Sequence, residues 1–390
     1  MKIIDLDKIC IAKCPHGMEE ILADELRALG APEAMLQKRA VAFKANKETL
    51  YKINLHSRLA IKILCPIFDF TAKHPEELYK KVKAFDWNQV LTLEQTFAVQ
   101  TTVHSPHFEH SQYVALKTKD AIVDQFYDRV NKRPDVNVKE PDIKIHVHIS
   151  EANCNVFLDA SGDPLFKRGY KMNTGVAPIN EVLAAGMLVL SGWEPSKPLV
   201  DPMCGSGTIA IEAAMIATNT PASILREDFG FMHWSDFDKA LWEKVKQAGK
   251  DQVKESAAQI FAYDKELSMV KYAEQNAVEI GLDSAIQFKR KDFMHLSPPA
   301  EDGMIITNPP YDERIQIEDN EAFYKAIGDR FKQAFQGYTA WLISSNLSAI
   351  KRVGLRPSKK LTLFNGKLEC KFLKYELYGG SKKAKYANQA

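Results

Sequence analysis

The chain has 390 residues, of which 45% are hydrophobic and 26% are charged, so it is long enough for two or three domains that each bury a core. Its formal net charge of +2 does not by itself indicate a polyanionic partner. The six cysteines form no CxxC pair, and no apolar run approaches the ~20 residues of a membrane span. We therefore expect a cytoplasmic protein without membrane association.

The first 65 residues predict a small α+β domain of the ferredoxin-like type. Short apolar strands are expected at 9–13, 41–43 and 60–64. Helices are expected from Gly17 to Gly30 and over 47–55, because apolar residues recur there at helical spacing. The alternation of strands and helices favours one layer of each.

Residues 66–165 predict a second α+β domain. Alternating, β-rich segments occupy 95–103, 142–149 and 153–159, and helices are expected over 76–85 and 111–130. Three histidines, His104, His107 and His110, lie in a loop-like stretch. A metal site is disfavoured because no cysteine or acidic pattern completes it, which leaves RNA contact or a plain surface.

The remainder of the chain predicts a doubly wound parallel sheet. Short apolar strands alternate with helices expected over 208–217, 268–280 and 322–335. These strands are expected at 199–200, 260–263, 285–291, 304–307 and 340–343. The spacing between Asp201 and Asp264 is unusually long, and the additional residues, 219–254, are interpreted as an inserted helical lid. A final hairpin over 360–377 is expected around Asn365-Gly366.

The segment Asp201-Pro-Met-Cys-Gly-Ser-Gly-Thr208 follows a strand and opens a helix. Its glycines let the backbone approach a ligand closely, and the helix start offers free N–H groups. The segment lacks the third glycine of the dinucleotide fingerprint and the Lys-Ser/Thr of a P-loop. It is therefore interpreted as the floor of a cofactor pocket that does not mainly hold phosphates.

Two acidic residues end the next two strands. Asp264 is placed where a carboxylate can accept two hydrogen bonds from ribose hydroxyls. Asp292 could receive an adenine amino group, or it could simply cap a helix or turn.

The tetrapeptide Asn308-Pro-Pro-Tyr311 follows a fourth strand. The prolines fix the backbone and remove its donors, so the Asn308 oxygen and the Pro309 carbonyl can both accept from one planar amine. Tyr311 can stack on the ring that carries this amine. Acceptors on an aromatic amine direct its nitrogen lone pair toward an electrophile, which is what methylation of an exocyclic base nitrogen needs.

These motifs together resemble those of the THUMP-domain, class I S-adenosylmethionine-dependent RNA methyltransferases, nearest the bacterial large-subunit rRNA guanine-N2 group. The resemblance extends to the front half through 14–19 and 161–170 and covers nearly the whole chain. It implies an α/β, Rossmann-like catalytic domain preceded by ferredoxin-like and THUMP domains. The implied boundaries are 1–65 for the ferredoxin-like domain, 66–165 for the THUMP domain, 166–380 for the methyltransferase domain and 381–390 for a basic tail.

The resemblance also implies the site residues. Target-base and catalytic contacts are expected at Asn308, Pro309, Pro310 and Tyr311. Contacts to S-adenosylmethionine are expected at Asp201, Met203, Cys204, Gly205, Ser206, Gly207, Thr208, Asp264, Lys265, Asp292, Phe293 and Asn308. No metal is implied. Asp312 departs from the glycine usual in the family.

Two basic features remain open to interpretation. Residues 351–385 hold eleven Lys and Arg side chains that form either a solvated face or contacts to phosphates. The same choice applies to Lys167, Arg168 and Lys171. A nucleophilic role for Cys204 is disfavoured because direct transfer to nitrogen needs no covalent enzyme intermediate.

The resulting hypothesis is methyl transfer to an exocyclic base nitrogen in RNA, with guanine N2 of 23S rRNA favoured by the resemblance alone. The alternatives are an adenine-N6 methyltransferase on DNA or RNA, and an RNA-binding assembly factor without activity. The exact nucleotide, the oligomeric state and the choice between naked rRNA and an assembled particle do not follow from the sequence.

Overall fold

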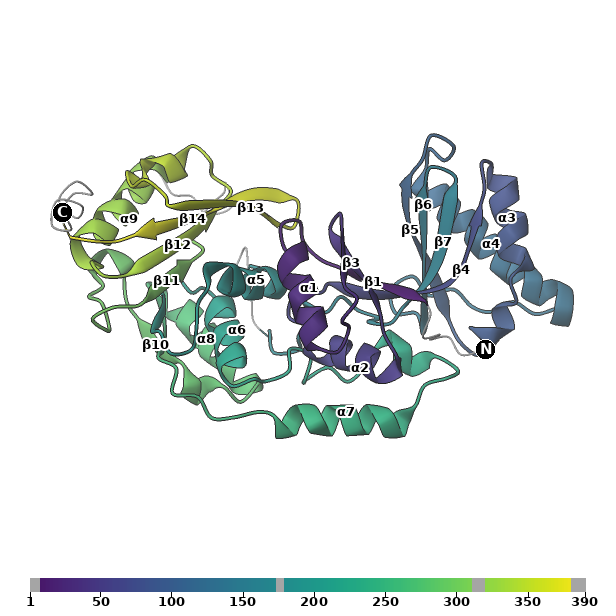
Figure 1. Cartoon of the computed structure of the whole chain (residues 1–390), viewed down its shortest axis with the longest axis horizontal. Helices are drawn as coiled ribbons and strands as arrows, with labels where there is room; N and C mark the ends of the chain where they lie inside the picture. Colours follow the sequence, from purple (N-terminus) through teal and green to yellow (C-terminus); the bar gives the residue numbers. More distant parts are fainter. Residues whose placement is uncertain (1–7, 173–178, 311–319, 380–390) are drawn as a thin grey trace. The chain divides into compact units, whose positions relative to one another are not determined.

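A computed structural model of the chain describes residues 8–172, 179–310 and 320–379. Tyr311, Asp312 and the predicted tail 381–390 lie outside these residues. Contacts divide the chain into two compact units. The first comprises 1–14, 22–165 and 226–248, and the second comprises 15–21, 166–225 and 249–390. Each unit is built on one seven-stranded sheet (Figure 1).

The first sheet joins the two expected α+β domains. Its strands are β1 (Ile9–Lys13), β2 (Met35–Gln37), β3 (Ala40–Lys44), β4 (Lys62–Thr71), β5 (Phe97–His104), β6 (Ile143–Ser150) and β7 (Asn153–Asp159), in the order β2-β3-β1-β4-β7-β6-β5. Strand β4 pairs antiparallel with β1 on one side and with β7 on the other. The boundary expected between residues 65 and 66 therefore falls inside one continuous strand.

Four helices belong to this front part of the chain: α1 (Glu19–Ala28), α2 (Lys47–His56), α3 (Pro75–Ala84) and α4 (Ser111–Val130). Helix α4 packs on α3 and on β5. Ile143, Ile145, Val147 and Ile149 of β6 have no exposed surface, while the side chains between them are partly exposed. This alternation confirms the predicted half-buried strand.

The inserted segment packs in the first unit. Residues 226–248 include the 3-10 helix η2 (Gly230–His233) and most of α7 (Lys239–Asp251). The Phe231 ring stacks on Tyr51 of α2 with centroids 4.4 Å apart, and Trp242 meets the same tyrosine edge-on at 5.9 Å. The segment is thus held against α2 by aromatic packing.

The second sheet has the predicted Rossmann-like form. Its strands are β8 (Leu199–Asp201), β9 (Ile260–Asp264), β10 (Gln287–Arg290), β11 (Met304–Thr307), β12 (Thr339–Ser344), β13 (Lys359–Asn365) and β14 (Leu368–Glu376). The order is β10-β9-β8-β11-β12-β14-β13. The first five strands in this order are parallel, β14 runs antiparallel to β12, and β13–β14 is the predicted hairpin.

Helices α5 (Glu181–Ser191), α6 (Thr208–Ala217), α8 (Leu267–Glu279) and α9 (Asn320–Ala334) accompany this sheet. Helix α5 packs on α6, and α8 packs on β9 and β10. The sequence analysis did not predict α5, whose residues 181–188 are all buried and so show no polar face. Short 3-10 helices occur at η1 (Trp87–Gln89), η3 (Asp283–Ala285), η4 (Phe293–His295) and η5 (Ala349–Val353).

Among the helices in the described ranges, none is both long enough and apolar enough to cross a membrane.

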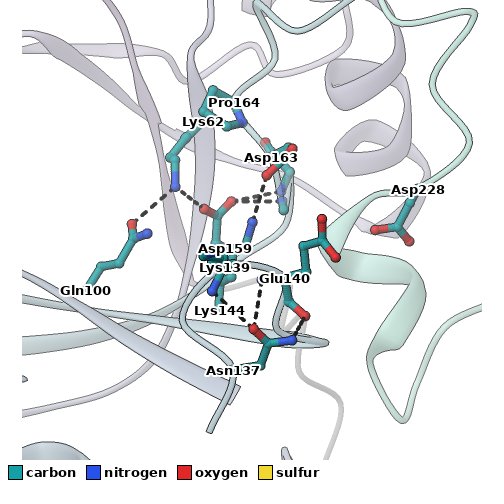
Figure 2. A network of polar contacts seen from close by, with 12 residues as sticks. Lys62, Gln100, Asn137, Lys139, Glu140, Lys144, Asp159, Asp163, Pro164 and Asp228 are labelled. Atoms are coloured by element: carbon teal, nitrogen blue, oxygen red, sulfur yellow. Dashed lines mark hydrogen bonds and ion pairs between the residues drawn. The ribbon is translucent and has the colours of Figure 1, made fainter. Parts of the chain in front are cut away.

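A buried ion pair ties the strands of the first sheet to the turn that follows them (Figure 2). The Lys62 ammonium lies 2.7 Å from Oδ2 of Asp159, whose side chain is 2% exposed. Oδ1 of Asp159 accepts from the amides of Ser161 and Gly162 at 3.0 and 3.2 Å. Burial raises the pKa of Asp159, and the charge of Lys62 opposes that rise. The carboxyl is thus stabilised by the nearby Lys62 ammonium, by turn amides and by the more distant charge of Lys144.

Removing this ammonium is expected to destabilise the first unit strongly. Lys62→Ala leaves Asp159 buried without its counter-charge, which costs about 3 kcal/mol of unfolding free energy. Lys81→Ala on the exposed side of α3 is the matched control and should change that free energy by less than about 0.5 kcal/mol. Urea unfolding of both variants checks this, and equal stabilities would contradict the assigned role.

Candidate active site

Strand β8 occupies the centre of the second sheet, between β9 and β11. Because β9 follows β8 on one side and β11 lies on the other, the strand order reverses at this point, where doubly wound sheets bind ligands. Ile305 of β11 is paired with Val200, and Ala262 of β9 is paired with Asp201. The polar residues that end these three strands therefore meet at one edge of the sheet.

Hydrogen bonds from backbone amides hold the loop after β8 against the end of β9. The amide of Cys204 donates to the carbonyl of Tyr263 at 2.9 Å, and the amide of Gly205 donates to Oδ2 of Asp264 at 3.0 Å. The amide of Gly207 closes the turn on the Cys204 carbonyl at 2.8 Å. The predicted residues Asp201 to Thr208 and Asp264 are thus brought together.

The two glycines of this loop have different roles. Both have left-handed backbones, with φ of 53° at Gly205 and 83° at Gly207, which favour glycine. A Cβ on Gly207 would lie 2.8 Å from Cβ of Ala273, whereas a Cβ on Gly205 would meet nothing within 4 Å. Gly207 therefore allows α6 and α8 to pack, and Gly205 borders open space that a ligand can occupy.

Helix α6 starts at this loop without a capping side chain, because its N-cap is Gly207. The N–H groups of its first turn are then left to water or to a ligand. Thr208 and Ser206 are buried, and Met203 is partly buried against the neighbouring core. The buried side chains of this loop therefore mainly determine its shape.

One buried acid, Asp201, and one partly buried acid, Asp264, lie beside the loop. Burial raises the pKa of Asp201 well above its usual range, and the nearby charge of Asp264 raises it further, although the Met203 amide opposes both. Oδ1 of Asp201 is buried and has no hydrogen-bond partner in the described part of the chain. Burial also raises the pKa of Asp264, against the amides of Glu266 and Gly205. An acceptor such as Oδ1 of Asp201, which no described donor satisfies, suits a ligand that brings hydroxyl or amine donors.

Lys265 follows β9, and Asp292 and Phe293 follow β10. These residues offer fewer side-chain groups for cofactor contact than the resemblance implied. Oδ1 of Asp292 accepts from the amide of Met294 at 2.9 Å, so the capping alternative holds for this oxygen. The Phe293 ring packs against Phe331 and Phe335 in the core, which leaves only its main chain for a cofactor. Lys265 is exposed.

Asn308 stands directly after β11. Its Oδ1 is buried and lacks a hydrogen-bond partner among the residues that the structure describes. Pro309 is buried and Pro310 is partly buried, and neither carries an N–H that could satisfy this oxygen. Tyr311, the predicted stacking residue, lies outside the described residues. The arrangement presents one fixed acceptor at the edge of the sheet.

Other candidates are assigned structural positions. Arg168 is 1% exposed, with Nε 3.4 Å from Oε1 of Glu212, and the Lys171 ammonium lies 3.0 Å from Oε1 of Glu181. Neither alternative left open by the sequence, a solvated face or phosphate contact, describes these two side chains, because both charges are paired inside the second unit. Burial holds the pKa of Cys204 well above its usual range, with Asp201 and Asp264 adding to the rise. That thiol is neutral and unsuited to act as a nucleophile.

Within 8–172, 179–310 and 320–379, no group of three or more His, Cys, Asp or Glu side chains could hold a metal ion.

The sequence analysis missed one residue of the loop's surroundings. Asn276 of α8 is fully buried, and its side chain donates to the carbonyl of Ser206 at 3.0 Å. The only signal in the sequence is a polar residue on the apolar face of a helix, which points to no particular partner.

The glycine assignments predict different outcomes for two alanine substitutions. Gly205→Ala should cost roughly 1 kcal/mol of stability for the left-handed backbone, yet abolish S-adenosylhomocysteine binding because its methyl enters the open space. Gly207→Ala should cost about 3 kcal/mol because it also clashes with α8. Thermal unfolding and calorimetric titration of both variants check this. Normal ligand affinity in Gly205→Ala would contradict the placement of the pocket.

The family models match three parts of the chain. Residues 168–374 match the RMKL-like methyltransferase domain, residues 72–159 match the THUMP domain, and residues 9–64 match the RlmL ferredoxin-like domain.

Relatives of known name are similar over nearly the whole chain. A Synechocystis protein named "putative RNA methyltransferase" is 39% identical over 369 residues, which cover 94% of this chain and 96% of that protein. The ribosomal RNA large subunit methyltransferase K/L of Syntrophotalea carbinolica is 36% identical over 378 residues, covering 94% of this chain. The chain spans 53% of the length of that relative.

Solved structures share the architecture. A possible methylase from Clostridium difficile 630 has a TM-score of 0.85 and 30% identity, covering 96% of this chain and 99% of its own. A putative methyltransferase complexed with SAH (S-adenosylhomocysteine) has a TM-score of 0.83 and 31% identity, covering 96% and 98%. A Listeria monocytogenes protein described as a predicted N6-adenine-specific DNA methylase has a TM-score of 0.83 and 27% identity, covering 96% of each chain.

The glycine loop, the strand-end acids and the asparagine-proline segment thus occur in a chain that matches one family model over more than half its length. The chain belongs to the RMKL-like family of S-adenosylmethionine-dependent methyltransferases and carries RlmL ferredoxin-like and THUMP domains.

Proposed function

We propose that this chain transfers a methyl group from S-adenosylmethionine to an exocyclic base nitrogen in RNA, and that this nitrogen is N2 of a guanine in 23S rRNA. The observation that carries the proposal is Oδ1 of Asn308, which is buried beside the switch point of the sheet and has no hydrogen-bond partner among the described residues. A fixed acceptor without a protein donor suits a ligand that brings an N–H group, and an exocyclic amine brings two.

The residues of the chain would bind and orient both reactants. Bound S-adenosylmethionine supplies an electrophilic methyl group. Asp264 would accept from ribose hydroxyls, and the Gly205 position leaves room for the ligand. Asn308 and the Pro309 carbonyl would accept from the amine and favour the positive charge that develops on it. Catalysis would then come from positioning and from prearranged acceptors, and the proton would leave to water.

Support for RNA comes from two sources, whereas guanine N2 rests on the resemblance alone. The THUMP domain covers residues 72–159, and two of the similar proteins are named as RNA methyltransferases. The base has to be unpaired or flipped to reach Asn308. The competing proposal is adenine N6, since the same acceptors suit that amine and a similar structure is described as an N6-adenine-specific DNA methylase. An inactive assembly factor would retain RNA binding and lack cofactor binding.

Removing the acceptor should abolish most turnover and spare the cofactor. Asn308→Ala is expected to lower methyl transfer to rRNA by a factor of about 100 or more, with unchanged affinity for S-adenosylhomocysteine. Transfer of a labelled methyl group, followed by nucleoside analysis, measures this and identifies the product. Full turnover in Asn308→Ala would sink the assignment. N6-methyladenosine as the product would favour the competing base, and absent cofactor binding by the parent chain would favour the assembly factor.

The raised pKa of Asp264 gives the site a pH dependence. Only the carboxylate accepts two hydroxyl donors, so protonation weakens cofactor binding. An ordinary aspartate has a pKa of about 3.9. Because burial raises the pKa of Asp264, the affinity for S-adenosylhomocysteine should begin to fall at a higher pH than it would if Asp264 titrated as an ordinary aspartate. Calorimetric titrations at decreasing pH check this. Asp264→Asn should bind weakly and lose this dependence; a parent-like profile in that variant would exclude Asp264 as its cause.

A further inference from the structure

Asn276 of α8 connects two distant segments inside the second unit. Its side chain has no exposed surface. Oδ1 accepts from the amide of Met172 at 3.0 Å, and Nδ2 donates to the carbonyl of Ser206 at 3.0 Å. One side chain thus joins the segment that enters the catalytic unit to the loop at the cofactor pocket.

The contact with Ser206 holds one peptide group from both ends. The carbonyl of Ser206 and the amide of Gly207 belong to the same planar unit. Asn276 binds the carbonyl, and the amide donates to the Cys204 carbonyl at 2.8 Å. Flanking glycines rotate easily, because they tolerate backbone angles that other residues avoid. The two hydrogen bonds therefore keep this peptide from turning over and hold the orientation of the loop between Gly205 and α6.

Residues 166–172, which lead into the second unit, make a second set of contacts next to the same loop. Nε of Arg168 lies 3.4 Å from Oε1 of Glu212, and the Tyr170 hydroxyl donates to that oxygen at 3.2 Å. All three side chains are 1% exposed or less. Glu212 belongs to α6, the helix that starts at the cofactor loop. Residues 166–172 are thus anchored to the helix through Glu212 and to the loop through Asn276.

We propose that Asn276 is a positioning residue for S-adenosylmethionine: it fixes the Ser206–Gly207 peptide and so preforms the loop that receives the cofactor. It touches neither the methyl group nor the target base. Without its amide, the Ser206 carbonyl loses its buried donor and the loop has to be ordered by the ligand itself. Part of the binding energy is then spent on ordering, and affinity falls.

The expected effect is on binding more than on chemistry. Asn276→Ala should raise the Kd for S-adenosylhomocysteine, measured by calorimetry, and the KM for S-adenosylmethionine by about tenfold. The kcat at saturating cofactor should change by less than about threefold. Unfolding free energy will also fall, because a buried polar contact is lost, so stability alone does not test the proposal.

Asn54 offers a matched control in the first unit. It is also fully buried, with Nδ2 donating to the Leu50 carbonyl at 2.9 Å and Oδ1 accepting from the Ser161 hydroxyl at 2.8 Å. Asn54→Ala therefore removes a comparable pair of hydrogen bonds far along the chain from the loop. It should lower stability and leave the Kd for S-adenosylhomocysteine within about twofold of the parent value.

Three outcomes would overturn the proposal. The first is a parent-like Kd and KM in a folded Asn276→Ala variant, and the second is an equal loss of affinity in Asn54→Ala. The third is a fall in kcat without a change in Kd. If Asn276→Ala does not fold, Asn276→Leu keeps nearly the same volume while removing both hydrogen bonds. It should fold and show the same loss of affinity, and normal affinity in it would equally reject the proposal.

Discussion

The parallel pairing of β8 with β9 on one side and β11 on the other is the constraint on which the site depends. Parallel strands end at one edge, so Asp201, Asp264 and Asn308 have to lie near each other although more than 100 residues separate the first from the last. The reversal of strand order at β8 leaves room at this edge. The loop to α6 then closes against β9 through the Gly205 amide and the Asp264 carboxylate. Oδ1 of Asp201 and Oδ1 of Asn308, which would be hydrated on a surface, are buried here and have no donor among the described residues.

The fold was largely predictable wherever local pattern and tertiary contact agree. Helices 111–130 and 208–217 and strands 153–159 and 304–307 were expected with the bounds they have. Amphipathic spacing, a polar strand end or, for the mostly buried helix 208–217, the glycine loop that opens it marks each of them. Helix α5 was missed because residues 181–188 are all buried and show no polar face, and no such motif precedes the helix. The single sheet through β4 was missed because strand pairing joins residues such as Leu64 and Asp159, which no local signal connects. The packing partner of the insertion was missed for the same reason, since its aromatic residues contact α2, which is far away in sequence.

The site was predictable as a set of positions and less so as a set of roles. Glycines at left-handed turns and acids at strand ends follow from backbone geometry, and the structure brings Asp201–Thr208 and Asp264 together. Side-chain roles depend on burial, which the sequence does not state. Phe293 was assigned to the cofactor and its ring lies in the core, and Arg168 was considered for phosphate contact and lies in a buried pair with Glu212. Asn276 is the opposite case, a residue with a contact to the loop that was not predicted. This contact depends on how α8 packs, and a single asparagine in a helix does not indicate it.

The account is tested most directly by the product that the chain makes. Purified chain, labelled S-adenosylmethionine and 23S rRNA from cells that lack the gene would be combined, and the digested nucleosides separated by mass spectrometry. The account predicts label in N2-methylguanosine at a single position, and rRNA from parent cells should accept no label there. Label in N6-methyladenosine, or transfer to DNA in place of rRNA, would contradict it.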